Sequence, residues 1–96
     1  MATLHIENTV RDFDQWKAAF DKFEQFRADK GVRSYRVSRY AADPNFLTID
    51  LDFDSVAMAE QFRGHLAKIW ATPQSQEQLV SHGEPLLFDV VVQRDL

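Results

Sequence analysis

Five large aromatic side chains recur at helical spacing within residues 12–31, and this pattern constrains the fold more than any other feature of the sequence. Successive rings are separated by three, four, three and three residues: Phe13, Trp16, Phe20, Phe23 and Phe26. Such spacing predicts one α-helix with all five rings on a single face. Because a buried aromatic side chain removes ~150–250 Å² from water, the rest of the chain must provide the surface that covers this face.

The residues at the two ends of this segment predict where the helix begins and ends. Asp12 can cap the first turn through its side-chain oxygen, and Gln15, three residues later, completes a capping-box pattern. We expect the helix to continue to Lys30, because Gly31 can take the left-handed conformation that ends helices.

Alternating apolar and polar residues predict four β-strands. They cover residues 3–10, 32–40, 46–54 and 86–93. A turn over residues 41–45 joins the second strand to the third, which should place Arg36 opposite Asp50. In the last strand, the side chains expected to face the core are those of Leu86, Phe88, Val90 and Val92.

Two further helices are predicted between the third and fourth strands. Ser55 caps the first, whose apolar face carries Ala59, Phe62, Leu66 and Ile69 or Trp70. Thr72 and Pro73 begin a short second helix, which the segment 81–83 closes. The resulting order, βαββαβ, is that of the ferredoxin-like α+β fold, a four-stranded antiparallel sheet with its helices on one face. Residues 1–96 should form this single domain.

Composition limits the possible partners and chemistry. A formal net charge of −4 provides no basic face for nucleic acid. The chain has no cysteine, no signal-peptide pattern at its start and no apolar run of ~18 residues, so we expect a cytoplasmic protein that does not enter membranes. Its three glycines lack the spacing of a phosphate-binding loop and its three histidines that of a zinc site, so neither a cofactor nor a metal is predicted.

Five stretches of the sequence carry a resemblance to a known group of proteins. They are LHIENTV at 4–10, DFDQWK at 12–17, FD at 20–21, GVRSYRV at 31–37 and LDFDS at 51–55. Together they resemble the dimeric α+β barrel superfamily, and within it the small proteins related to the antibiotic-biosynthesis-monooxygenase domain. The resemblance implies a homodimer whose two sheets pack face to face, with a ligand pocket between sheet and helices in each protomer. Members include cofactor-independent oxygenases of polyketide quinones, haem-degrading enzymes, small isomerases and many proteins without a known activity.

Two polar residues are candidates for catalysis. Asn8 ends the apolar alternation of the first strand, so its side chain can point toward the helices, or it can bond to backbone in the adjoining loop. His82 could act as a ligand or general base, or it could interact with a helix end in an exposed loop. The haem-degrading relatives combine an Asn near position 8 with a Trp and an iron-ligating His. This sequence departs from that pattern, because Phe62 and a residue near Thr72 stand at the latter two positions.

Four aromatic side chains could line a pocket for a flat ligand, or could simply fill a solid core: Trp16, Phe20, Phe62 and Trp70. The first hypothesis is therefore a homodimer that binds a hydrophobic or aromatic small molecule between sheet and helices and could act as a cofactor-independent monooxygenase. The alternative is a non-catalytic, stress-related or accessory dimer, and haem binding is a third hypothesis. The opposite face of the sheet, with His5, Glu7, Asp50 and Asp52, would meet either water or the second protomer.

Overall fold

A computed structural model of the protein describes residues 1–96, except for the side chain of Gln74. Its elements are β1 (Ala2–Val10), α1 (Phe13–Asp21), α2 (Glu24–Asp29), β2 (Ser34–Tyr40), β3 (Asp43–Phe53), α3 (Val56–Trp70), α4 (Pro73–Gln78), β4 (Leu79–His82) and β5 (Leu86–Asp89). The antiparallel strands are ordered β2-β3-β1-β4, and β5 also pairs with β1. The predicted ferredoxin-like α+β fold is confirmed, but an additional short strand, β4, precedes the last one, so the sheet has five strands instead of four.

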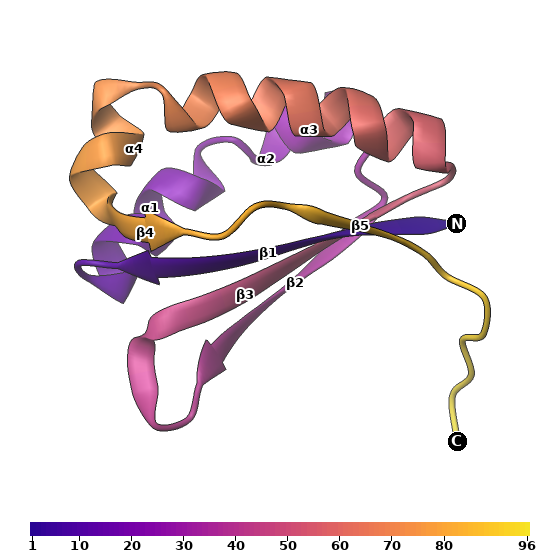
Figure 1. Cartoon of the computed structure of the whole chain (residues 1–96), viewed down its shortest axis with the longest axis horizontal. Coiled ribbons are helices and arrows are strands. Elements are labelled where there is room, and N and C mark those ends of the chain that lie inside the picture. The colour runs from indigo at the N-terminus through magenta and orange to yellow at the C-terminus, as the bar shows by residue number, and fades with distance from the viewer.

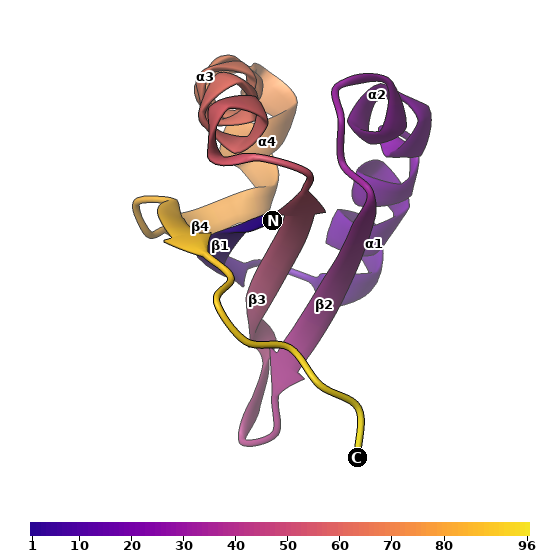
Figure 2. The same ribbon diagram turned by 90° about the vertical axis from the view of Figure 1, so that its right-hand side faces the viewer.

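The helices lie together on one side of the sheet (Figures 1 and 2). In Figure 2, α1 and α2 form one half of this layer and α3 and α4 the other, while no helix covers the opposite face of the sheet. We call this opposite face the free face. The segment that follows β5 runs away from the helices toward the C-terminus.

The core lies between the sheet and the helical layer. It is formed by alternate residues of the two central strands, namely Ala2, Leu4, Ile6 and Val10 of β1 and Leu47, Ile49, Leu51 and Phe53 of β3. α3 adds Ala59, Phe62 and Leu66. The strand alternation and the apolar face of α3 predicted from the sequence are therefore confirmed.

The prediction of one continuous helix over residues 12–30 is wrong. The segment forms two helices, α1 and α2, with a break between them. At the break, the backbone N–H of Phe23 donates to the carbonyl of Phe20, only three residues earlier, at 3.1 Å. This tight turn rotates the second half of the segment relative to the first. As a result, Trp16 is buried whereas Phe23 is 41% exposed, and the five rings do not share one face.

The Asp12 cap and the Gly31 stop predicted for this segment are confirmed, but Gln15 does not complete a capping box, because its Oε1 accepts from Gln78. The Asp12 carboxylate accepts from the backbone N–H groups of Asp14 and Gln15 at 2.9 and 3.4 Å. Gly31 has a φ of +99°, and a Cβ atom at this position would lie 2.5 Å from Met58 Cε. Glycine is favoured here by the left-handed backbone, whereas the contact is with the flexible end of the Met58 side chain.

The hairpin of β2 and β3 has the predicted register, with Arg36 opposite Asp50. Its turn is shorter than predicted, because β3 begins at Asp43 and only Ala41 and Ala42 remain outside the strands. An irregularity between Arg39 and Tyr40 brings Tyr40 opposite Asp43 and closes the hairpin there.

Two predictions near the C-terminus are wrong. Residues 81–83 do not close a helix; Ser81 and His82 belong to β4, where His82 pairs with Asn8 of β1. The last strand ends at Asp89, and its faces are reversed from the prediction, since Leu87 packs against the core whereas Leu86 and Phe88 are 50% and 52% exposed. Register explains the reversal: Leu87 lies opposite the buried Leu4, so its neighbours must face the other way.

Candidate functional site

A cavity of about 480 Å³ lies between the sheet and the helices. Its apolar wall is formed by side chains of β1, β3 and all the helices, among them Ile6, Trp16, Phe20, Ile49, Phe62, Leu66 and Trp70. The four aromatic residues predicted as a pocket wall all line it, and the rings of Trp16 and Phe20 are stacked with centroids 4.8 Å apart. Flat apolar surfaces of this kind suit a planar aromatic ligand.

Exposed residues among those that line the cavity mark its opening to solvent. They are Gln15, Ala18, Lys22, Phe23, Thr72 and Glu77, from α1, α4 and the adjoining loops. We call this set the mouth. The Gln78 side-chain amide donates to Gln15 Oε1 across the mouth at 3.4 Å, a long contact that leaves α1 and α4 only weakly linked.

Asn8 places an amide in this otherwise apolar cavity. It is only 3% exposed and lines the cavity from β1, between Leu47 of β3 and His82 of β4 in the strand register. The helix-side orientation expected from the strand alternation is therefore observed. Asn8 Oδ1 is buried and has no hydrogen-bond partner within the described part of the chain. A buried polar atom without a partner costs free energy, so this amide is suited to a ligand group.

Arg27 of α2 is a second buried polar residue of the cavity, and the sequence analysis did not identify it. Its side chain is 4% exposed, and Nη1 donates to the carbonyl of Phe20 at 2.8 Å. The guanidinium carbon lies 3.6 Å from the centroid of the Phe20 ring and 4.9 Å from that of Tyr35. These rings attract the cation through their negative faces. Nε and Nη2 are buried without a partner among the described residues.

A signal for Arg27 was present in the sequence. Arg27 follows Phe23 by four residues and Phe20 by seven, so it stands on the same helical face as the aromatic side chains. A cation within an apolar face would ordinarily be treated as a boundary residue that extends into water. In the structure Arg27 is buried instead. The break between α1 and α2 leaves the Phe20 carbonyl available to Arg27 and turns α2 so that the Arg27 side chain is covered.

His82 lies beside the cavity and not within its wall. Its exposed ring stacks on the indole of Trp70, with centroids 4.1 Å apart and planes at 27°. Trp70 does line the cavity, so it separates His82 from the enclosed space. No cluster of three His, Cys, Asp or Glu side chains among the described residues could hold a metal ion.

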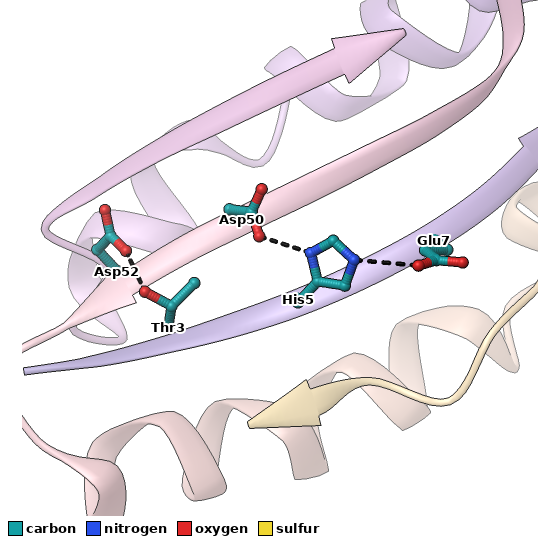
Figure 3. Close-up of polar contacts among 5 residues, drawn as sticks. All are labelled: Thr3, His5, Glu7, Asp50 and Asp52. Carbon is teal, nitrogen blue, oxygen red and sulfur yellow. Dashed lines mark hydrogen bonds and ion pairs between the residues drawn. The ribbon is translucent and has the colours of Figure 1, made fainter. Parts of the chain in front are cut away.

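The free face of the sheet carries a different kind of polar cluster (Figure 3). His5 Nδ1 lies 2.7 Å from Asp50 Oδ1, and His5 Nε2 lies 3.2 Å from Glu7 Oε2. Asp52 accepts from the Thr3 hydroxyl at 2.6 Å and from the Ser34 hydroxyl at 2.9 Å. The hydrogen bond from Asp50 raises the pKa of His5 above 6.5; partial burial opposes this effect and Glu7 reinforces it. Every side chain in this cluster has a partner in its own chain.

Among the described residues, no helix combines the length and the apolar character needed to cross a lipid bilayer. The cytoplasmic location expected from the sequence stays a prediction.

Comparison with known proteins shows similarity in structure only. No family model matches the sequence, and no curated protein matches it. Among solved structures, Rv0793 from Mycobacterium tuberculosis superposes with a TM-score of 0.69 at 18% identity, over 99% of this chain and 100% of that one. Protein SO0527 from Shewanella oneidensis gives 0.68 at 15% identity, over 91% and 87% of the two chains.

A third structure of the same shape is described as an antibiotic biosynthesis monooxygenase. It superposes with a TM-score of 0.60 at 13% identity, over 96% of this chain and 100% of that one. Identities this low establish the fold and leave the activity open. The chain thus has the ferredoxin-like α+β fold of the antibiotic-biosynthesis-monooxygenase-like proteins, as the sequence resemblance implied.

Proposed function

We propose that the protein binds a flat, largely hydrophobic small molecule in the cavity between sheet and helices. The observation that carries this proposal is the cavity itself, about 480 Å³ in volume and walled by Trp16, Phe20, Phe62 and Trp70. Ligand pockets in proteins have this range of volume and combine apolar walls with a few polar groups. The buried amide of Asn8, whose Oδ1 is unpaired among the described residues, is such a group.

Binding of 2-naphthamide, a flat and uncharged probe, tests this proposal. Titration calorimetry should give saturable binding, with quenching of tryptophan fluorescence because two indoles line the cavity. Ala19→Phe, which adds a ring to a cavity-lining position of α1, should abolish binding. Ala57→Phe, on an exposed position of α3, is the matched control and should leave it unchanged.

Absence of binding by the natural protein would contradict the proposal. The other prediction from the sequence, a non-catalytic accessory dimer whose aromatic residues serve only the core, would then be preferred. Equal binding by Ala19→Phe and the natural protein would also contradict it, because the probe would be bound elsewhere.

A second proposal for the same cavity is cofactor-independent oxygenation. It is supported by the monooxygenase of the same fold and by the buried amide of Asn8 within a largely apolar wall. In this reaction an activated methylene group loses a proton, and the carbanion adds O₂. Loss of water then leaves a carbonyl, so one oxygen atom enters the product and the other forms water. Asn8 would hydrogen-bond the enolate oxygen, and a dry cavity would favour the carbanion.

His82 is the candidate proton acceptor in this second proposal. Its ring would have to leave its stack on Trp70 and turn toward the cavity to reach a ligand. Oxygen uptake with anthrone as the probe should fall in Asn8→Ala and His82→Ala, whereas His65→Ala, a histidine outside the cavity wall, should have no effect. Uptake no faster than in buffer would rule out oxygenation of this probe class and leave the binding proposal intact.

We further propose that two copies associate through the free faces of their sheets. Leu86 and Phe88 are half exposed there, since they lie opposite His5 and Thr3 of β1. Val91 and Val92, in the segment after β5, are 84% and 81% exposed. Apolar side chains gathered on one face commonly mark an association surface. The side chains of His5, Asp50, Glu7 and Asp52 on this face already have partners within the chain, which lowers the cost of covering them.

Sedimentation analysis tests the association. The natural protein should be dimeric at micromolar concentration, and Phe88→Glu should convert it to a monomer. Val56→Glu, at a position of α3 that is 46% exposed, is the control and should remain dimeric. A monomeric natural protein at all workable concentrations would contradict this part of the proposal.

A further inference from the structure

Arg27 brings a positive charge into the wall of the apolar cavity. Arginine stays protonated in proteins, and its transfer from water to a buried position is unfavourable unless an anion or several acceptors surround it. Of the acceptors that the structure describes, only the Phe20 carbonyl is bonded to this guanidinium, at 2.8 Å. No carboxylate of the described chain forms an ion pair with it; the nearby Glu24 instead accepts from the Tyr35 hydroxyl at 3.0 Å.

The two unpaired donors of Arg27 occupy adjacent positions. Nε–H and the neighbouring N–H of Nη2 form one edge of a guanidinium group and point in parallel, and this edge is the one that binds both oxygens of a carboxylate. The guanidinium carbon lies over the ring of Phe20 and close to that of Tyr35, and Nη1 is bonded to the Phe20 carbonyl. Only the carboxylate-binding edge is left unpaired among the described residues.

We propose that the natural ligand is a planar aromatic carboxylate whose two oxygens bind the Nε and Nη2 edge of Arg27 while its ring lies against the aromatic wall. This inference rests on the proposed binding function and specifies its substrate class. The exposed Lys22 at the mouth adds a second positive charge on the route of entry. The charge of the whole chain is −4, so a preference for an anion must come from these local cations.

Comparison of 2-naphthoate with its uncharged analogue 2-naphthamide tests the inference at pH 7 by titration calorimetry. The natural protein should bind the carboxylate at least about tenfold more tightly, as expected for a charge-assisted bidentate pair in a buried site. Arg27→Met should remove this preference, so that the affinities for the two probes agree within about twofold, because Met cannot pair with a carboxylate.

Two control variants separate Arg27 from other cations. Arg33→Met removes an arginine that is 67% exposed and pairs with Asp54, and it should retain the full preference. Lys22→Met should change the preference by less than about twofold, because exposed charges are screened. Arg27→Lys, which keeps the positive charge but lacks the two parallel N–H donors of the guanidinium, should retain only part of the preference.

The possible outcomes distinguish this inference from the function on which it rests. Equal affinities of the natural protein for the two probes, unchanged in Arg27→Met, would overturn the inference and leave the binding proposal standing. Failure of both probes to bind would overturn the binding proposal itself. If circular dichroism shows that Arg27→Met is unfolded, the test uses the ratio of the affinities for 2-naphthoate and 2-naphthamide, measured in the natural protein and in Lys22→Met. A ratio near one in the natural protein overturns the inference.

Discussion

The two faces of the sheet differ in how they treat polar side chains. On the free face, the ring of His5 lies between Asp50 and Glu7 (Figure 3), and Asp52 accepts two hydroxyl hydrogen bonds. On the helix side, Asn8 and Arg27 are almost fully buried, and each has polar atoms without a partner among the described residues. The half-exposed face therefore pairs its polar groups, whereas the buried face leaves them unpaired.

Elementary energetics predicts the opposite, because unpaired polar atoms cost most where water is excluded. A chain selected only for stability would pair the groups on the helix side first, or replace them with apolar side chains. The proposed ligand binding would account for their place beside a cavity, because a bound molecule would supply the missing partners. Paired polar groups on an open face instead fit a structural or interface role.

The largest expected difference is in the free energy of unfolding when neighbouring residues of β1, one on each face of the sheet, are replaced by alanine. Leu4→Ala removes a fully buried side chain on the helix side and should lower the free energy of unfolding by ~2–5 kcal/mol. Thr3→Ala, on the free face, removes only the hydrogen bond to Asp52 and should cost about 1 kcal/mol. Urea denaturation measures both, and equal losses would contradict the distinction between the faces.

The next effect tests whether the helix side is a pocket wall or a solid core. Trp16→Ala should cost roughly 2 kcal/mol, less than the ~3–5 kcal/mol of a tryptophan in solid core, because one side of the indole already borders a cavity. The affinity for 2-naphthamide should fall by roughly tenfold. Phe23→Ala, at the mouth, is the control, with an expected loss below about 1 kcal/mol. A full core penalty with unchanged binding would show that Trp16 serves packing alone.

Arg27→Met tests whether the unpaired charge is retained for function at the expense of stability. The free energy of unfolding in the absence of ligand should be unchanged or should rise by about 1 kcal/mol, because an apolar side chain of similar size replaces an unpaired buried cation. Thermal and urea unfolding measure the change. A loss of more than about 2 kcal/mol would instead mean that the contacts of Arg27 with Phe20 and Tyr35 hold α1 and α2 together.

The smallest effect concerns pH and the free face. Because the pKa of His5 is raised in the folded protein, chiefly by its hydrogen bond to Asp50, the associated stabilisation is complete below 6.5. It is lost as pH rises through the elevated folded-state pKa. His5→Gln should therefore destabilise the protein more at pH 5.5 than at pH 8.5, by less than about 1 kcal/mol because the pair is solvent-screened.

Asp50→Asn provides the control for the pH prediction. It removes the first cause of the raised pKa, so within an Asp50→Asn background the effect of His5→Gln on stability should depend less on pH in this window, with Glu7 as the remaining cause. A larger difference at pH 8.5 than at pH 5.5 in the original pair would mean that the sign of the argument is wrong.

Much of the fold could be predicted because the relevant signals are short in range. The caps at Asp12, Ser55 and Thr72 and the left-handed Gly31 depend on residues within one turn of each. The buried alternation of β1 and β3 was readable because polar residues occupy the other face. In the candidate site, the same alternation gave the orientation of Asn8, and helical spacing gave the four aromatic residues of the wall.

The predictions that failed concern which of two possible surfaces a side chain faces. Leu86, Leu87 and Phe88 are all apolar, so alternation could not say which of them faces the core, and pairing with Leu4 decided it. Likewise, His82 is a chemically attractive residue in the sequence, yet its place beyond Trp70 became apparent only from the packing of α3 against β4.

The sequence alone determined the order of the main strands and helices, the caps of the helices and the side of the sheet on which each central strand is apolar, because interactions within a few residues set these features. Tertiary structure decided the break between α1 and α2, the faces of β5 and the burial of Arg27. These depend on which distant surfaces meet: the guanidinium is covered only when Phe20, Tyr35 and the turned α2 come together around it.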